Sequence, residues 1–138
     1  MTITEMSAGE YNEVHTLWQV AEGVGLSRSD TKESVARFLE RNPGLSFVAH
    51  DGGRTVGAVL CGHDGRRGYI HHLAVHPRYR RRGIGRALVE RCLLALRQAG
   101  IDKCHLFVFN SNQEAIAFWK SIGWQHRIEL SMMSHFTR

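Results

Sequence analysis

The chain has 138 residues, of which 43% are hydrophobic and 22% are charged, and its net charge is +5. This length is typical of one domain, and this composition of a globular protein with an apolar core. We expect no membrane span, because no run of about 18 apolar residues is present, and no leader, because residues 1–10 lack a basic-then-apolar pattern. Three widely spaced cysteines indicate reduced thiols in a cytoplasmic protein. We also expect no membrane partner. The modest positive charge favours an anionic ligand.

Two helices are predicted at the start of the chain. Ser7 followed three residues later by Glu10 is typical of a capping box, and apolar residues then recur at helical spacing. A second start signal, Asp30 followed by Glu33, begins another amphipathic stretch. The segment 42–44, Asn-Pro-Gly, must end that helix, because proline has no N–H and disfavours helix in the residue before it.

Short β-favouring runs come next. Residues 45–50 and 55–61 are apolar and flank the turn sequence Asp-Gly-Gly at 51–53, which predicts a hairpin. Residues 69–75 predict a third strand, which Pro77 prevents from continuing.

In the second half of the chain, segments with helical spacing of apolar residues alternate with short β-favouring runs. The predicted elements are a helix over 84–99 capped by Gly100, a strand over 104–109, a helix over 112–122, and one or two last strands within 124–134. Strand–helix–strand units require parallel neighbours. The order of elements therefore predicts one α/β domain with a mixed α+β sheet, antiparallel in its early strands and partly parallel later, with helices on both faces.

The segment from His72 to Leu88 carries the clearest chemical signal. It runs from an apolar strand through a basic loop into a helix. Gly83 and Gly85 let the backbone approach a ligand closely, and the N–H groups of a first helical turn attract anions. Arginine side chains add forked donors for phosphate oxygens. The alternative is an ordinary solvated arginine face. The run does not end in the Gly-Lys-Ser/Thr of a Walker loop, and Leu88 occupies the third glycine position of the dinucleotide fingerprint.

Two linked motifs resemble a known family. Arg80-x-x-Gly83-x-Gly85, preceded by Leu73-Ala74-Val75-His76-Pro77, is similar to the coenzyme A signature of the GCN5-related N-acetyltransferase (GNAT) superfamily. Asn112-x-x-Ala115-x-x-Phe118-Trp119-x-x-x-Gly123-Trp124 resembles the second motif of that family, which usually has Phe-Tyr and Gly-Phe. The resemblance extends from Tyr69 to Trp124.

The resemblance implies a GNAT-like fold with a V-shaped splay between the strands at 70–75 and 104–109. Acetyl-CoA binds in that splay as the acetyl donor, and no metal is expected. The positions that match the cofactor-binding residues of the family are Leu73, Ala74, Val75, Arg80, Arg81, Arg82, Gly83, Ile84, Gly85, Arg86 and Asn112. Asn112 also fits a helix N-cap, and the two roles are compatible.

The implied reaction is a direct attack of a primary amine on the thioester in a ternary complex. An amine with a lysine-like pKa is neutral in only about one molecule in a thousand near pH 7, so a base is needed. His71 is the candidate, at a position where the serotonin N-acetyltransferase branch carries a histidine. The alternative for His71 is a half-buried histidine satisfied by hydrogen bonds. We expect His72 on the opposite face of the sheet, because strand side chains alternate.

The chain departs from the family at Trp119. Many members have a tyrosine there, which returns a proton to the departing thiolate. An indole N–H donates a hydrogen bond but does not exchange its proton in this way. Trp119 is therefore a catalytic candidate only as a hydrogen-bond donor, and the general acid is unassigned.

Several functions remain open at this stage. The resemblance implies a small-molecule or peptide amine as the acceptor. Residues 18–30 and 64–68 are its candidate contacts, with core packing and a solvated hairpin tip as their alternatives. A homodimer is an expectation from the family alone. The rival functions are an inactive acyl-CoA-binding relative, a metal enzyme and a nucleic-acid-binding module. Five arginines within 78–86 suggest the last, but no nucleic-acid-binding motif accompanies them. Nine histidines suggest the metal enzyme, but they lack the spacing of zinc ligands.

Overall fold

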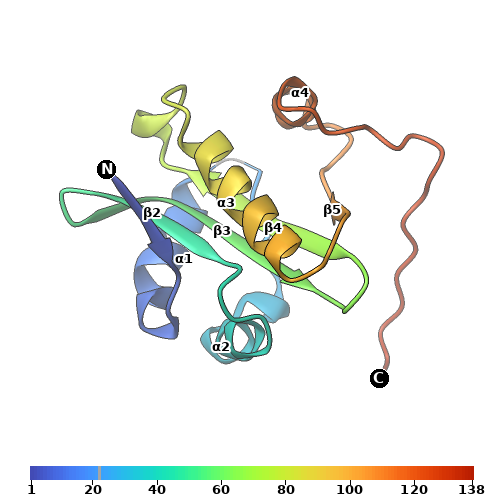
Figure 1. The fold of residues 1–138 in the computed structure, drawn as a ribbon, viewed down its shortest axis with the longest axis horizontal. Coiled ribbons are helices and arrows are strands. Elements are labelled where there is room, and N and C mark those ends of the chain that lie inside the picture. Colours follow the sequence, from blue (N-terminus) through green and yellow to red (C-terminus); the bar gives the residue numbers. More distant parts are fainter. Residues whose placement is uncertain (22) are drawn as a thin grey trace. The chain divides into compact units, whose positions relative to one another are not determined.

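The computed structural model describes residues 1–21 and 23–138 and forms two compact units, Met1–Phe107 and Val108–Arg138. The first unit contains a five-stranded sheet with the helices α1, α2 and α3, and the second contains α4 (Figure 1). In chain order the elements are β1 (Thr2–Glu5), η1 (Ala8–Glu10), α1 (Tyr11–Val20), η2 (Arg28–Asp30), α2 (Lys32–Arg41), β2 (Phe47–Asp51), β3 (Arg54–His63), β4 (Gly68–Val75), η3 (Pro77–Tyr79), α3 (Ile84–Gln98), β5 (Cys104–Leu106) and α4 (Gln113–Ser121).

The sheet has the strand order β1-β2-β3-β4-β5. The first four strands pair antiparallel, and β4 pairs with β5 in parallel. This confirms the predicted mixed sheet and the hairpin between β2 and β3. β1 was not predicted: its four residues, Thr-Ile-Thr-Glu, alternate too briefly to stand out, and they form a strand by pairing with β2.

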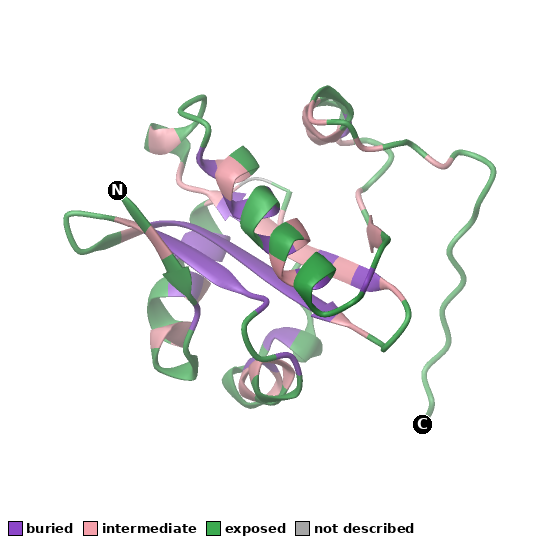
Figure 2. Cartoon of the chain, in the orientation of Figure 1, coloured by how far each residue is buried: buried purple, intermediate pink, exposed green. Residues whose placement is uncertain are grey.

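Helices cover both faces of the first unit's sheet. Ala58 and Leu60 of β3 belong to the same buried cluster as Trp18 of α1. Gly57, one residue away on β3, faces the other side, because a Cβ on it would lie 3.1 Å from Leu88 of α3. Since β2 and β3 lie between these helices, most of their residues are buried (Figure 2).

The first two helices begin close to their predicted positions, with one correction. The backbone N–H of Ser7 donates to Glu10 Oε1 over 2.9 Å, as expected of the capping box. The second helix is capped by Thr31, whose hydroxyl accepts from the N–H of Ser34 at 3.2 Å. Asp30 is therefore not the N-cap of this helix. It lies one residue earlier, ends η2, and is only 9% exposed.

The second unit consists of α4 and an irregular C-terminal segment. α4 begins at the N-cap Asn112 and ends before Gly123, as predicted. The prediction of strands within 124–134 is wrong, because none of these residues is in a strand. Apolar residues do alternate there, but Ile128 and Leu130 are exposed, and alternation alone makes no strand without a hydrogen-bonded partner. Among the described residues no helix has the length and apolar character needed to cross a membrane.

Candidate active site

β4 changes its side-chain alternation at its centre. Ala58 of β3 pairs with Ala74, and Leu60 pairs with His71, so two residues of β4 stand opposite one residue of β3. His72 has a φ of 50°, a left-handed conformation that is uncommon for a residue other than glycine. This is a β-bulge, a feature that re-aims side chains and locally bends a strand. N-terminal to it, Gly68 faces Leu96 of α3. C-terminal to it, Ala74 packs in the cluster on the α1 face.

The bulge overturns the expectation that His71 and His72 point to opposite faces. The imidazole of His71 contacts Phe38 of α2, with ring centroids 5.9 Å apart. The imidazole of His72 lies 5.0 Å from the ring of Trp18, on α1. Phe38 and Trp18 pack in one cluster, so both histidines lie on the same side of the sheet. The extra residue of the bulge breaks the alternation on which the expectation rested.

β4 and β5 stop pairing just before the bulge. Their parallel pairing covers residues 68–70 of β4 with 104–106 of β5 and then ends. Among the described residues no strand pairs with that side of β4 after Ile70. The predicted strand over 104–109 is thus limited to Cys104–Leu106. The edge of β4 at residues 73–75 is open to an extended ligand that offers backbone-like donors and acceptors.

The basic loop between β4 and α3 has the geometry of an anion-binding site. Arg81 has a φ of 63°, and Gly83, the N-cap of α3, has a φ of 78°. Left-handed residues in such a loop turn successive N–H groups inward, and the start of α3 adds its own N–H groups and the positive end of its dipole. A Cβ on Gly83 would meet no atom within 4 Å, so the space beside its backbone is open.

The arginines of this loop differ in their surroundings. Arg82 lies over the ring of Tyr79 at 4.8 Å, and Arg86 donates to Glu90 over 3.1 Å in an exposed pair. Exposed i,i+4 ion pairs contribute little free energy. Glu90 therefore holds Arg86 weakly, and Arg86 remains available to a phosphate near the first turn of α3.

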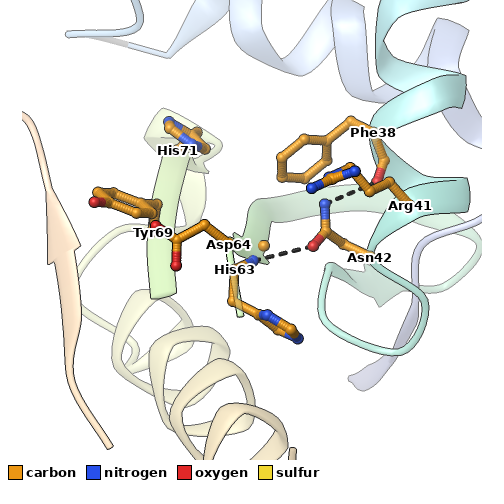
Figure 3. A pocket seen from close by; sticks show the side chains of 8 residues that line it. Phe38, Arg41, Asn42, His63, Asp64, Tyr69 and His71 are labelled. Atoms are coloured by element: carbon orange, nitrogen blue, oxygen red, sulfur yellow. Dashed lines mark hydrogen bonds between the residues drawn. The ribbon is translucent and has the colours of Figure 1, made fainter. Parts of the chain in front are cut away.

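His71 lines a pocket of about 200 Å³ between α2 and the β3–β4 hairpin (Figure 3). The lining residues are Phe38, Arg41, Asn42, Gly62, His63, Asp64, Tyr69 and His71. The rings of Tyr69 and His71 are stacked on the same face of β4, 6.5 Å apart. Burial lowers the pKa of His71 below its usual 6.5, and the neighbouring His72 lowers it further, while Asp30 opposes the shift. His71 is therefore neutral near pH 7 and able to accept a proton.

Comparison with known proteins decides the family. The sequence model of the Acetyltransferase (GNAT) family matches residues 11–124. The chain belongs to this family. The acetyltransferase SG1711 of Sodalis glossinidius (strain morsitans) is 34% identical over 127 residues, which are 91% of this chain and 87% of that protein. The chain is therefore an acetyltransferase.

Solved structures show the same GNAT fold. The ribosomal-protein alanine N-acetyltransferase of Escherichia coli superposes with a TM-score of 0.73 at 27% identity, covering 88% of this chain and 76% of that one. The PaiA N-acetyltransferase of Thermoplasma acidophilum, solved in complex with coenzyme A, superposes with a TM-score of 0.78 at 16% identity, covering 90% of this chain and 89% of that one. These neighbours support the interpretation of the mixed sheet as a GNAT sheet.

The GNAT motif residues fall into the two units. Residues 71–75 and 80–86 lie in the first unit, on β4, on the loop that follows it and at the start of α3. Asn112 and Trp119 lie in the second. The side chain of Asn112 accepts from the N–H of Ala115 at 3.0 Å, so its N-cap role is confirmed and its cofactor contact stays a prediction. Trp119 packs against Trp124 with ring centroids 4.9 Å apart.

Two residues of the segment 18–30, which was predicted to contact the acceptor, do not lie at the pocket. Trp18 is 2% exposed and belongs to the core, so it does not line the pocket. Asp30, at the other end of the segment, binds His72. This contact was not predicted, because a helix-start signal and an inward-facing carboxylate look alike in sequence. Within the segment, Glu22 lies outside the described residues. Among the described residues no group of His, Cys, Asp and Glu could hold a metal ion.

Proposed function

We propose that the chain, acting as one domain over residues 1–138, is an N-acetyltransferase that moves an acetyl group from acetyl-CoA to a primary amine. The observation that carries the proposal is the open edge of β4 beyond Ile70, which continues directly into the anion-binding loop at the start of α3. One extended ligand with amide groups at one end and a pyrophosphate further along matches this pair of features. Acetyl-CoA, when bound, supplies the activated thioester.

The cofactor residues of the proposal follow this geometry. Backbone groups of Leu73, Ala74 and Val75 would pair with the amide groups of the cofactor arm along the open edge. The backbone and side chains of residues 80–86 would hold the pyrophosphate. Arg81 and Gly83 are left-handed, and loops with such residues can present successive N–H groups to one anion. The absence of nearby atoms beside Gly83 supports this fit, because a phosphate needs room against the backbone.

His71 is the proposed base. It lines a pocket and is neutral near pH 7, because burial lowers its pKa. The amine would give its proton to this imidazole, directly or through water, as its nitrogen bonds to the acetyl carbon. The C–S bond then breaks, and coenzyme A leaves as the thiol. Trp119 is proposed as a hydrogen-bond donor to the departing sulfur, with water returning the proton, because indole does not exchange its own.

The pocket beside His71 is the proposed acceptor site, and the acceptor class is a small-molecule or peptide amine. The Escherichia coli neighbour, by its name, acetylates an alanine of a ribosomal protein. Its relation to this chain supports a peptide amine as the first class to screen. The free thiols of Cys61, Cys92 and Cys104 support the cytoplasm as the compartment. The proposed reaction involves neither nucleic acid nor membrane.

Calorimetric titration of acetyl-CoA into the purified chain tests the proposal. The control is the double variant Gly83→Asp/Gly85→Asp, which places two carboxylates where the pyrophosphate would bind. We expect micromolar binding by the wild type and its loss in the variant. No binding by the wild type would refute the proposal, and the arginine run would then be tested with generic DNA at varied salt.

Trp119 supports a second candidate, an inactive acyl-CoA-binding relative, because the usual tyrosine is missing at this position. Free thiol released from acetyl-CoA in the presence of an amine panel separates the two. Release above the rate without enzyme supports acetyl transfer. Tight binding without release from any amine favours the inactive relative.

A further inference from the structure

Every side-chain oxygen of Asp30 is engaged, although the residue lies in the short connection between α1 and α2. Its Oδ2 accepts from the backbone N–H of Ser27 at 2.9 Å, and its Oδ1 lies 2.7 Å from His72 Nε2. Its backbone carbonyl accepts from the hydroxyl of Tyr11 at 2.6 Å. Asp30 is 9% exposed. A carboxylate this buried is retained only where its partners are fixed, because an unpaired buried charge is strongly disfavoured.

His72 has the complementary arrangement on the sheet. Its imidazole is held between the Asp30 carboxylate and the ring of Trp18, and its side chain is 17% exposed. Its backbone has the left-handed φ of 50° at the bulge. Such a conformation persists only where the surroundings impose it. The imidazole of His72 contacts Asp30 and Trp18, and these contacts restrain the residue.

We propose that Asp30 and His72 are positioning residues of the acetyl-transfer site, whose hydrogen bond holds the bulge of β4 in the conformation that leaves residues 73–75 open to the cofactor. The inference rests on the proposed function, because it assigns a task to the open edge. It adds to the site Asp30, a residue of the connection between α1 and α2 that lies outside the cofactor motifs.

The geometry separates this role from that of the base. The Nε2 atom of His72 is already bound to Asp30, and His72 is not among the residues that line the pocket. His71 does line it. Neighbouring histidines on one face of the sheet thus have different tasks: His71 meets the acceptor, and His72 fixes the backbone.

Two substitutions of His72 test the backbone role. His72→Ala removes the imidazole but keeps a side chain in the left-handed conformation, whereas His72→Gly removes the imidazole and the steric penalty together. We expect the Kd for acetyl-CoA to rise on the order of tenfold in His72→Ala, which matches the left-handed penalty of a non-glycine residue. In His72→Gly we expect a rise of no more than about threefold.

Two substitutions of Asp30 test the hydrogen bond. In Asp30→Asn the amide oxygen can still accept from Ser27 while the amide nitrogen donates to His72, so the contacts survive without the charge. We expect Asp30→Asn to bind acetyl-CoA within about threefold of the wild type and Asp30→Ala to lose about as much as His72→Ala. Should Asp30→Ala not fold, the two His72 variants decide the matter alone.

Amide hydrogen exchange in the free protein gives a second readout that needs no ligand. We expect the amides of residues 72–74 to exchange faster in His72→Ala and Asp30→Ala than in Asp30→Asn. His50→Ala is the matched control, because His50 of β2, the second strand from β4 in the sheet, forms another imidazole–carboxylate pair with Glu10 of η1, 3.1 Å apart. This control should change neither the exchange at residues 72–74 nor the Kd.

The inference and the proposed function fail in different ways. A wild type that does not bind acetyl-CoA refutes the proposed function. The hydrogen-exchange comparison still tests whether the Asp30–His72 hydrogen bond maintains the conformation of the bulge. A wild type that binds, together with an unchanged Kd in His72→Ala, overturns the inference alone. Equal losses in His72→Ala and His72→Gly also overturn it, because the conformation of the bulge would then not be what the pair maintains.

Discussion

The ring of Phe38 meets the His71 imidazole edge-on, with centroids 5.9 Å apart and planes inclined at 80°. This contact joins α2 to β4 and places His71 at the wall of the pocket rather than in the core. It also withdraws the imidazole from water, which is the main cause of its lowered pKa.

Replacing His71 tests its role as the base. We expect His71→Gln to lower kcat by about 10²- to 10⁴-fold, because glutamine keeps a polar side chain but accepts no proton. The Kd for acetyl-CoA, measured by calorimetry, should change little. A kcat within threefold of the wild type would exclude His71 and point to a chain of water molecules as the base.

The pH dependence of kcat/KM follows from the direction of the pKa shift. A base must be neutral in the free enzyme, and burial lowers the pKa of His71 below 6.5. Loss of activity through this group is therefore expected only as the pH falls through that lowered pKa, at more acidic pH than for an exposed histidine. Initial rates at limiting amine over a pH series measure this limb, which should disappear in His71→Gln. A limb at or above pH 6.5 that persists in the variant would contradict the assignment.

Gly83 and Gly100 offer a matched pair for the cofactor loop. Both have a left-handed φ, 78° and 83°, and a Cβ on either would meet no atom within 4 Å. Replacing either by alanine should therefore cost a similar free energy of unfolding, about 1 kcal/mol. Only Gly83→Ala should weaken acetyl-CoA binding, on the order of tenfold. Equal affinities in the two variants would argue against a ligand at the start of α3.

Trp119 is tested by two aromatic replacements. If the indole N–H supports the departing sulfur, Trp119→Phe should lower kcat about tenfold, the value of one hydrogen bond. Trp119→Tyr restores the residue usual in the family and should retain or raise kcat, because a phenol can return a proton. Steady-state rates of thiol release measure both. Full activity in Trp119→Phe would remove any polar role from this residue.

Gly62 is tested by a stability measurement. A Cβ on Gly62 would lie 2.8 Å from Phe38 and 2.8 Å from Asn42, whose side chain binds the N–H of His63. We expect Gly62→Ala to lower the free energy of unfolding by about 1–3 kcal/mol through overpacking, as measured by urea denaturation. Gly9→Ala is the control, because its Cβ would have its nearest neighbour at 3.8 Å. Equal urea midpoints for Gly62→Ala and Gly9→Ala would mean that Phe38 and Asn42 move aside without loss of stability.

The features predicted correctly from the sequence are those with local causes. The capping box at Ser7, the turn at 51–53 and the helix end at Gly100 each depend on a few adjacent residues. The splay of the sheet followed from the GNAT resemblance alone. The errors concern partners distant in sequence. β1 forms because it pairs with β2, and Asp30 turns inward because it binds His72, which is 42 residues away in the sequence. Local periodicity carries no information about such contacts.

The same limit explains the error over His72. Alternation was assumed to run unbroken along β4, and one inserted residue was enough to reverse it. The pocket beside His71 was likewise beyond prediction, because its residues come from α2, β3 and β4.

The bulge also decides how β4 would respond to a change of length. Gly68 and Ala74 are six residues apart, a spacing that would put both side chains on one face of a regular strand, yet they lie on opposite faces. Deleting His72 would leave them five residues apart in a regular strand, so each would keep its present face. The packing of β4 between α1 and α3 therefore does not require the extra residue, and a shortened β4 would lose its left-handed residue while Gly68 and Ala74 keep their neighbours.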